Sequence, residues 1–149
     1  MRAILFASLI TAISSFAAAA QLGPCNGLAS AELIVEPWNE HIAAGADGEI
    51  RLTLLDACEP ASGAFHLLVL SPDPEGGRQC NILSAIVDEG FGAIDFDGIE
   101  VTDVPDGLMF AIATFFYNDE RANVDMEAPI YLHLAIDPMA GTIVLEEHL

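Results

Sequence analysis

The chain is a succession of short apolar runs, each followed by residues that favour turns. In the clearest run, residues 49–54, Ile50, Leu52 and Leu54 alternate with polar neighbours, which is the period of a half-buried strand. Stretches rich in Gly, Pro and Asp separate the runs, and no segment after the N-terminal apolar stretch keeps the periodicity of a helix. The same pattern predicts further strands over residues 31–36, 64–70, 82–88, 93–101, 108–117, 130–136 and 142–147.

About eight short strands of this kind predict an all-β fold, an antiparallel β-sandwich of the immunoglobulin-like or transthyretin-like type. Residues 64–70 and 108–117 are apolar on both faces, so both are predicted to be core strands that are covered on each side. The sequence contains no internal repeat, low-complexity region or linker. We therefore expect a single β-sandwich domain over residues 21–149.

Residues 1–20 have the order of a secretory signal peptide. Arg2 precedes an apolar run over residues 3–13, and small residues lead up to Gln21. The apolar run is too short to span a bilayer comfortably, and no later run reaches the ~18 apolar residues of a membrane helix. We expect cleavage after Ala20, where Ala18 and Ala20 occupy the small-residue positions. The mature protein is then periplasmic or secreted, without a membrane span.

The charge of the chain is strongly acidic. The formal net charge is −19 at pH 7, and all 23 Asp and Glu residues follow residue 20. Lysine is absent, and Arg51, Arg78 and Arg121 are the basic residues of the predicted mature chain. Because nucleic acids and anionic lipids bind through cationic contacts, this composition argues against both as partners. The main interpretation of the acidity is solubility, with the carboxylates spread over a solvated face, and attraction of cations or of a basic partner is the alternative.

Three cysteines, Cys25, Cys58 and Cys80, allow one disulfide in an exported chain. If the first three predicted strands form an antiparallel meander, Cys25 and Cys58 lie at one end of it. Cys80 then lies at the other end, roughly 20 Å away, which is too far for a disulfide. We therefore predict the pair Cys25–Cys58. The alternative pair, Cys58–Cys80, requires the loop 71–79 to fold back.

The segment FFYNDERANVDME, residues 115–127, is a candidate cation site because many side-chain oxygens follow an apolar run. Ca²⁺ takes about 6–8 oxygen ligands. The EF-hand spacing is absent, since Ala122 and Asn123 stand where that loop needs a ligand and a glycine. The main interpretation is a solvated loop between strands without a cofactor, and Ca²⁺ binding is the alternative. The candidate ligands are Asn118, Asp119, Glu120, Asn123 and Asp125.

No enzyme motif is present in the sequence. A Gly-x-Ser-x-Gly elbow, a phosphate-binding glycine loop and a His-Glu-x-x-His pair are all absent. Asp95 and Asp97 share one face of a predicted strand and fit an acidic surface better than a glycosidase pair. A hydrolase with residues from distant parts of the chain is the second alternative. The histidines, His41, His66, His133 and His148, lack the spacing of a copper site. His133 is predicted to point outward.

The segment VTDVPDGLMFAIATFFYND, residues 101–119, resembles part of a family of small exported bacterial domains of unknown function with a transthyretin-like sandwich. Residues 104–107 resemble the family's turn, residues 110–116 its Ala-rich strand and residues 118–125 its Asp/Asn-rich loop. This loop departs from the family's glycine-containing loop, because Arg121, Ala122 and Val124 interrupt the oxygen ligands here. The resemblance implies the fold and export, and it implies no activity.

These features together predict an exported, acidic, non-enzymatic binding or accessory module. Its expected partner is a protein of the cell envelope. Trp38, in a predicted loop beside Pro37, is a possible contact residue, because a tryptophan can anchor a peptide or sugar.

Overall fold

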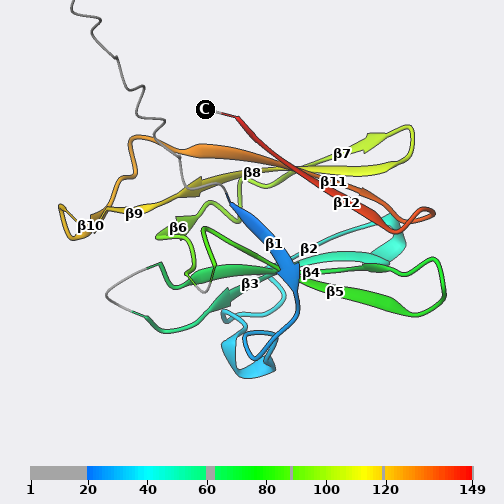
Figure 1. Ribbon diagram of the computed structural model, residues 1–149, viewed down its shortest axis with the longest axis horizontal. Coiled ribbons are helices and arrows are strands. Elements are labelled where there is room, and N and C mark those ends of the chain that lie inside the picture. Colours follow the sequence, from blue (N-terminus) through cyan, green and yellow to red (C-terminus); the bar gives the residue numbers. More distant parts are fainter. Residues whose placement is uncertain (1–19, 60–62, 88, 119, 149) are drawn as a thin grey trace, which may run out of the picture.

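The computed structural model describes residues 20–59, 63–87, 89–118 and 120–148, which form two antiparallel sheets packed face to face (Figure 1). This architecture confirms the predicted all-β sandwich. The first sheet consists, in spatial order, of β1 (Gln21–Pro24), β5 (Arg78–Ser84), β4 (Phe65–Pro72), β3 (Ile50–Asp56) and β2 (Ile42–Gly45). The second consists of β12 (Thr142–His148), β11 (Ile130–Asp137) and β8 (Gly107–Phe115), whose other side pairs with both β6 (Ala93–Ile94) and β7 (Glu100–Val104).

A small hairpin extends from one end of the second sheet (Figure 1). It consists of β9 (Tyr117–Asn118) and β10 (Asn123–Val124). Two short 3-10 helices, η1 (Ala31–Leu33) and η2 (Ala46–Gly48), lie in the connections of the first sheet. The described residues include no helix that is both long and apolar enough to cross a membrane.

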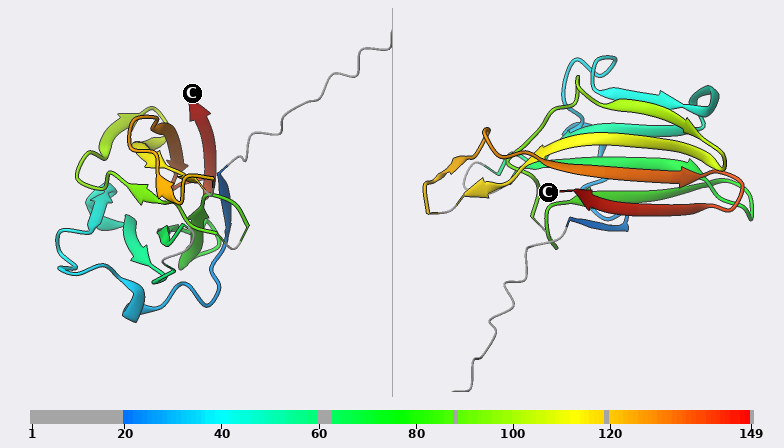
Figure 2. Two further views of the ribbon diagram at one scale, coloured as in Figure 1. Left: turned by 90° about the vertical axis from the view of Figure 1, so that its left-hand side faces the viewer. Right: turned by 90° about the horizontal axis from the view of Figure 1, so that it is seen from above.

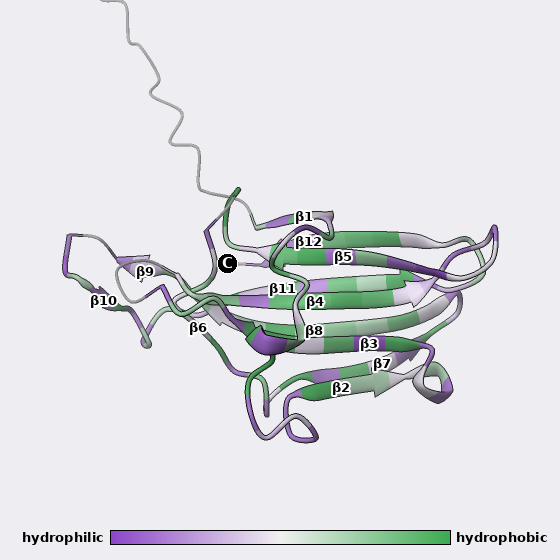
Figure 3. Cartoon of the chain, turned by 90° about the horizontal axis from the view of Figure 1, so that it is seen from below, coloured by the Kyte–Doolittle hydropathy of each residue, from purple (hydrophilic) through white to green (hydrophobic). Residues whose placement is uncertain are grey.

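The hydrophobic core lies between the two sheets. Alternate residues of the central strands point inward, so Leu52, Val69, Phe110 and Leu134 have no exposed surface. These side chains, contributed by both sheets, belong to one cluster. Figure 3 shows the hydrophobic residues concentrated along the strands, whereas the connecting loops and the β9–β10 hairpin carry much of the hydrophilic colour.

Three of the predicted strands are wrong in detail. The predicted strand 82–88 shares only residues 82–84 with β5, which begins earlier, at Arg78. Residues 31–36 form η1 and one isolated bridge to β3 instead of a strand. Residues 93–101 divide into β6 and β7, because the side chain of Asp95 accepts the backbone N–H of Gly98 at 3.1 Å and closes a turn between them. The residues between the two short strands are therefore a turn at the sheet edge.

The disulfide joins Cys25 to Cys80, with Cα atoms 5.4 Å apart, and Cys58 is free and exposed. The predicted pair Cys25–Cys58 and the alternative pair Cys58–Cys80 are therefore both wrong. The reason is β1, a strand that the sequence pattern did not indicate. It runs antiparallel to β5 with Pro24 opposite Asn81, which brings the next residue, Cys25, beside Cys80.

The outer faces of the two sheets differ. On the first sheet, outward-pointing Leu55 and Ile82 are buried, and the segment 25–41 lies on that side, away from the second sheet (Figures 1 and 2). On the second sheet, Tyr131 remains 49% exposed and Val144 51% exposed. The outer face of β8 is only half-buried, and so are Leu68 and Leu70 on the outer face of β4, so neither predicted core strand is fully covered on both sides.

The predicted signal peptide, apart from Ala20, lies outside the described residues. It therefore stays a prediction, and so does the extracytoplasmic location that depends on it. The disulfide is compatible with that location, because disulfides persist in oxidising compartments.

Candidate functional site

The predicted cation segment folds as the β9–β10 hairpin. Asn118 closes its turn, because its side-chain oxygen and its carbonyl accept the backbone N–H of Arg121 at 3.0 and 3.2 Å. The guanidinium of Arg121 in turn lies 3.5 Å from a carboxylate oxygen of Asp125. The other oxygen of Asp125 accepts the backbone N–H of Glu127 at 3.2 Å. An arginine and a backbone amide therefore already use the carboxylate that a cation would need.

The remaining candidate ligands do not converge on one point. Asp119 lies outside the described residues, and Glu120 and Asn123 are exposed. Within the described ranges, no group of three or more His, Cys, Asp and Glu side chains is placed to hold a metal ion. The calcium alternative has no geometric support in this part of the chain.

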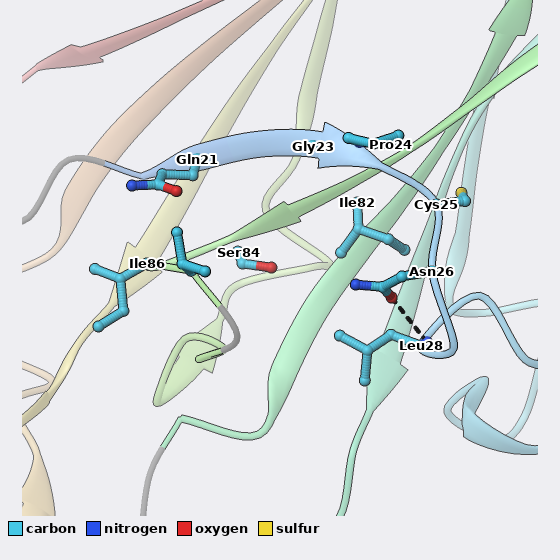
Figure 4. A pocket seen from close by; sticks show the side chains of 10 residues that line it. Gln21, Gly23, Pro24, Cys25, Asn26, Leu28, Ile82, Ser84 and Ile86 are labelled. Atoms are coloured by element: carbon cyan, nitrogen blue, oxygen red, sulfur yellow. Dashed lines mark hydrogen bonds between the residues drawn. The ribbon is translucent and has the colours of Figure 1, made fainter.

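A cleft of about 300 Å³ opens on the outer side of the first sheet, between β1, the end of β5 and the residues that follow each strand (Figure 4). Leu28, Ile82 and Ile86 form apolar walls, and the side chain of Ser84 lies between them. No charged side chain of the described residues lines the cleft. It is therefore a weakly polar hollow rather than a site for an ion.

Ser84 is hydrogen-bonded to a buried histidine, His66, across the first sheet. The Ser84 hydroxyl lies 2.8 Å from Nδ1 of His66, which is 2% exposed. Burial lowers the pKa of His66, and the charge of Glu59 opposes this shift in part. A serine bonded to a neutral imidazole is also found in acyl transfer, but this serine is itself only 9% exposed. We interpret the pair as a structural link between β4 and β5.

This buried histidine predicts a pH-dependent stability. The pKa of His66 is lower in the folded protein than in the unfolded chain, so the folded state favours the neutral imidazole. The stability that His66 contributes is therefore complete above its unfolded pKa of about 6.5. This stability is lost as the pH falls below that value. We expect the free energy of unfolding to decrease between pH 7.5 and 5.5 by no more than about 1.4 kcal/mol per pH unit from this group. Urea unfolding of the wild type and of His66→Gln over this range measures it. The His66→Gln curve should be flatter, and equal slopes would contradict the assignment.

A second hollow, of about 310 Å³, lies on the outer face of the second sheet, and we call it the β8 groove. Its floor is formed by Ala111 and Ala113 of β8. Because alanine side chains are short, the larger side chains of the neighbouring segments extend beyond them on both sides. The lining residues are Asp95, Gly98, Glu100, Ala111, Ala113, Tyr131 and His133.

The strand register places the walls of the β8 groove in two parallel rows. In one row Ala111 lies opposite Glu100 on one side and His133 on the other. In the next row, Ala113 accepts the backbone N–H of Asp95 at 3.0 Å and lies opposite Tyr131. In each row, therefore, the central alanine has a carboxylate on one side and an aromatic ring on the other. The two walls stand two strand spacings apart, about 10 Å.

The carboxylates of the β8 groove have no cationic partner among the described residues. Neither Asp95 nor Glu100 takes part in a salt bridge of that part of the chain, and none of the described arginines lines the groove. The turn bond to Gly98 holds Asp95 through one of its oxygens. Two acidic side chains that face an aromatic wall form a place where a cation can be held by charge and by the ring face.

The histidines and the candidate contact residue lie in separate places. His133 points outward, as predicted, with its ring centroid 4.3 Å from that of His148, whereas the ring of His41 lies 5.9 Å from Phe96. Trp38 is 53% exposed beside Pro37 and is not part of the β8 groove. Its role as a contact residue stays a prediction.

Sequence reasoning missed the β8 groove because its residues come from four strands or turns. A signal was nevertheless present. The outward positions of residues 108–117 include two alanines, and those of residues 130–136 include a tyrosine and a histidine. Small residues on one strand, beside large polar residues on the neighbouring strands, leave a groove in the face of a sheet.

No protein-family model, no curated protein and no solved structure matches this chain. The resemblance to the exported transthyretin-like family therefore stays a prediction. The function is therefore inferred from the geometry of the described residues.

Proposed function

We propose that this protein is an exported binding module that holds basic side chains of a partner protein in the β8 groove. The supporting observation is the pair of rows in which Asp95 and Glu100 face His133 and Tyr131 across an alanine floor. An extended Lys or Arg stem can lie over the alanines, with its charged end against the carboxylates. The ring of Tyr131, 49% exposed, offers a face to the same cation.

The overall charge supports a basic partner. With a net charge of −19 and no lysine, the chain attracts basic proteins over a distance and repels acidic ones. This long-range attraction is not specific to one site, since many carboxylates contribute to it. The β8 groove adds what non-specific charge attraction lacks, a defined binding position with an aromatic wall.

Binding of a defined basic probe tests the proposal. The probe is a short oligoarginine peptide, with a length-matched neutral peptide as reference, and its Kd is measured by calorimetry at about 0.15 M salt, where the Debye length is about 8 Å. We expect the double variant Asp95→Asn/Glu100→Gln to weaken binding about tenfold, or about 1.4 kcal/mol. Tyr131→Ala should weaken it several-fold through the lost ring face.

The matched control removes the same number of charges elsewhere. Glu32 and Glu75 are exposed and lie outside the β8 groove. The variant Glu32→Gln/Glu75→Gln should change the Kd by less than about twofold because screening weakens distant charges. If both double variants weaken binding equally, the peptide is held by general charge and the groove is not the site.

A further inference from the structure

Ala20 belongs to the folded domain. It is 8% exposed and is part of the hydrophobic core cluster. Its backbone N–H donates a hydrogen bond to a carboxylate oxygen of Glu147 in β12. Since β1 follows directly, Ala20 connects the edge strand of the first sheet with that of the second.

The two edge strands lie side by side at this point. Figure 2 shows β1, in blue, next to β12, in red, in both views. Leu22 of β1 and Leu145 of β12 are both packed against the core. Glu147 is half-buried, so its carboxylate is held at the seam rather than free in solvent. The contact with Ala20 therefore closes one open side of the sandwich.

This contact bears on where the predicted signal peptide is removed. Cleavage after Ala20 would discard a residue that is buried in the core and bonded to Glu147. Cleavage one residue earlier meets the same requirement for small residues, because Ala17 and Ala19 then occupy the two recognised positions. Of these two cleavages, only the earlier one keeps Ala20 in the mature protein.

We infer that the exported chain is cleaved between Ala19 and Ala20, and that the new N-terminus pairs with Glu147. Water hydrolyses the peptide bond, which leaves a carboxylate on Ala19 and an ammonium group on Ala20. The neutral amide donor at Glu147 thereby becomes a cationic one, and charge-assisted hydrogen bonds are stronger than neutral ones. This inference is independent of the β8 groove, and removal of the signal peptide strengthens the seam.

Mass spectrometry of the full-length protein, expressed in a host that exports it, tests the cleavage. We expect the intact mass of residues 20–149 and an N-terminal sequence beginning Ala-Gln-Leu. A chain that begins at Gln21 or later overturns the inference, and so does an exported chain that retains residues before Ala20.

Selective acetylation of the exported protein tests the pairing. Because the chain contains no lysine, the N-terminal amine is the amine that an acetylating reagent modifies, and hydroxylamine then removes any acetyl group from the exposed thiol of Cys58 and from tyrosines. We expect acetylation to lower the Tm of the wild type by about 2–4 °C and that of Glu147→Gln by less than about 1 °C, since the two changes remove the same interaction. The matched control is Glu146→Gln, at the exposed neighbouring residue, and it should respond to acetylation like the wild type. An equal shift in Glu147→Gln overturns the pairing.

Discussion

Replacing Cys25 and Cys80 by serine is expected to lower the free energy of unfolding by about 4 kcal/mol. The disulfide joins residues separated by 55 positions, so breaking it restores a large conformational entropy to the unfolded chain. It also holds the end of the short strand β1 against β5. Because a domain of this size has a total stability of roughly 5–15 kcal/mol, the variant should be close to unfolding at physiological temperature.

Urea unfolding of the double variant and of Cys58→Ser measures this effect with a matched control. Cys58 is exposed and free, so its replacement should change the free energy of unfolding by less than about 0.5 kcal/mol. A large loss in Cys58→Ser, or peptide mapping that finds Cys58 in the disulfide, would contradict the connectivity described above.

The second large effect is expected for Phe110→Ala in the core. Phe110 has no exposed surface and lies in β8 opposite Leu134 of β11 and Val101 of β7. Removing a buried aromatic ring leaves a cavity and costs about 3–5 kcal/mol.

Thermal or urea unfolding measures this loss in the free energy of unfolding, and two further variants serve as comparisons. Phe110→Leu fills much of the cavity and should cost clearly less. Val144→Ala, at a position that is 51% exposed on β12, should cost no more than about 0.5 kcal/mol. A small loss in Phe110→Ala would mean that the two sheets do not pack around this ring.

The strands that alternate strongly could be predicted from the sequence alone. Residues 49–54, 130–136 and 142–147 fall within β3, β11 and β12, apart from one residue at the start of β3. Their pattern is set by burial of one face, which is a local and repeated signal. The predictions failed where pairing partners decide the structure. The four residues of β1 have no alternation, and they form a strand because β5 offers them an edge.

The disulfide error has the same origin. The expectation that Cys58 lies far from Cys80 depended on β3 and β4 alone, and it holds. The position of Cys25 depended on β1, which the pattern could not reveal. A single unrecognised strand was therefore enough to change the partner of Cys25 from Cys58 to Cys80.

The β8 groove could be predicted only in part. The outward position of His133 followed from the alternation of its strand. Asp95 and Glu100 would lie on opposite faces of one continuous strand, and the turn between β6 and β7 brings them to the same side. Their meeting across Ala111 and Ala113 depends on the order β11-β8 and on β6 and β7 sharing the other edge of β8. That order is a property of the whole sheet, and no single segment encodes it.

The most direct test of the proposed function is an NMR titration of the mature, isotope-labelled protein with the oligoarginine peptide. If basic side chains bind in the β8 groove, the largest shifts of backbone amide signals should fall on Ala111, Ala113, Tyr131, His133 and the turn at Gly98. Shifts spread evenly over the acidic surface, or concentrated at Trp38 or in the β9–β10 hairpin, would contradict it.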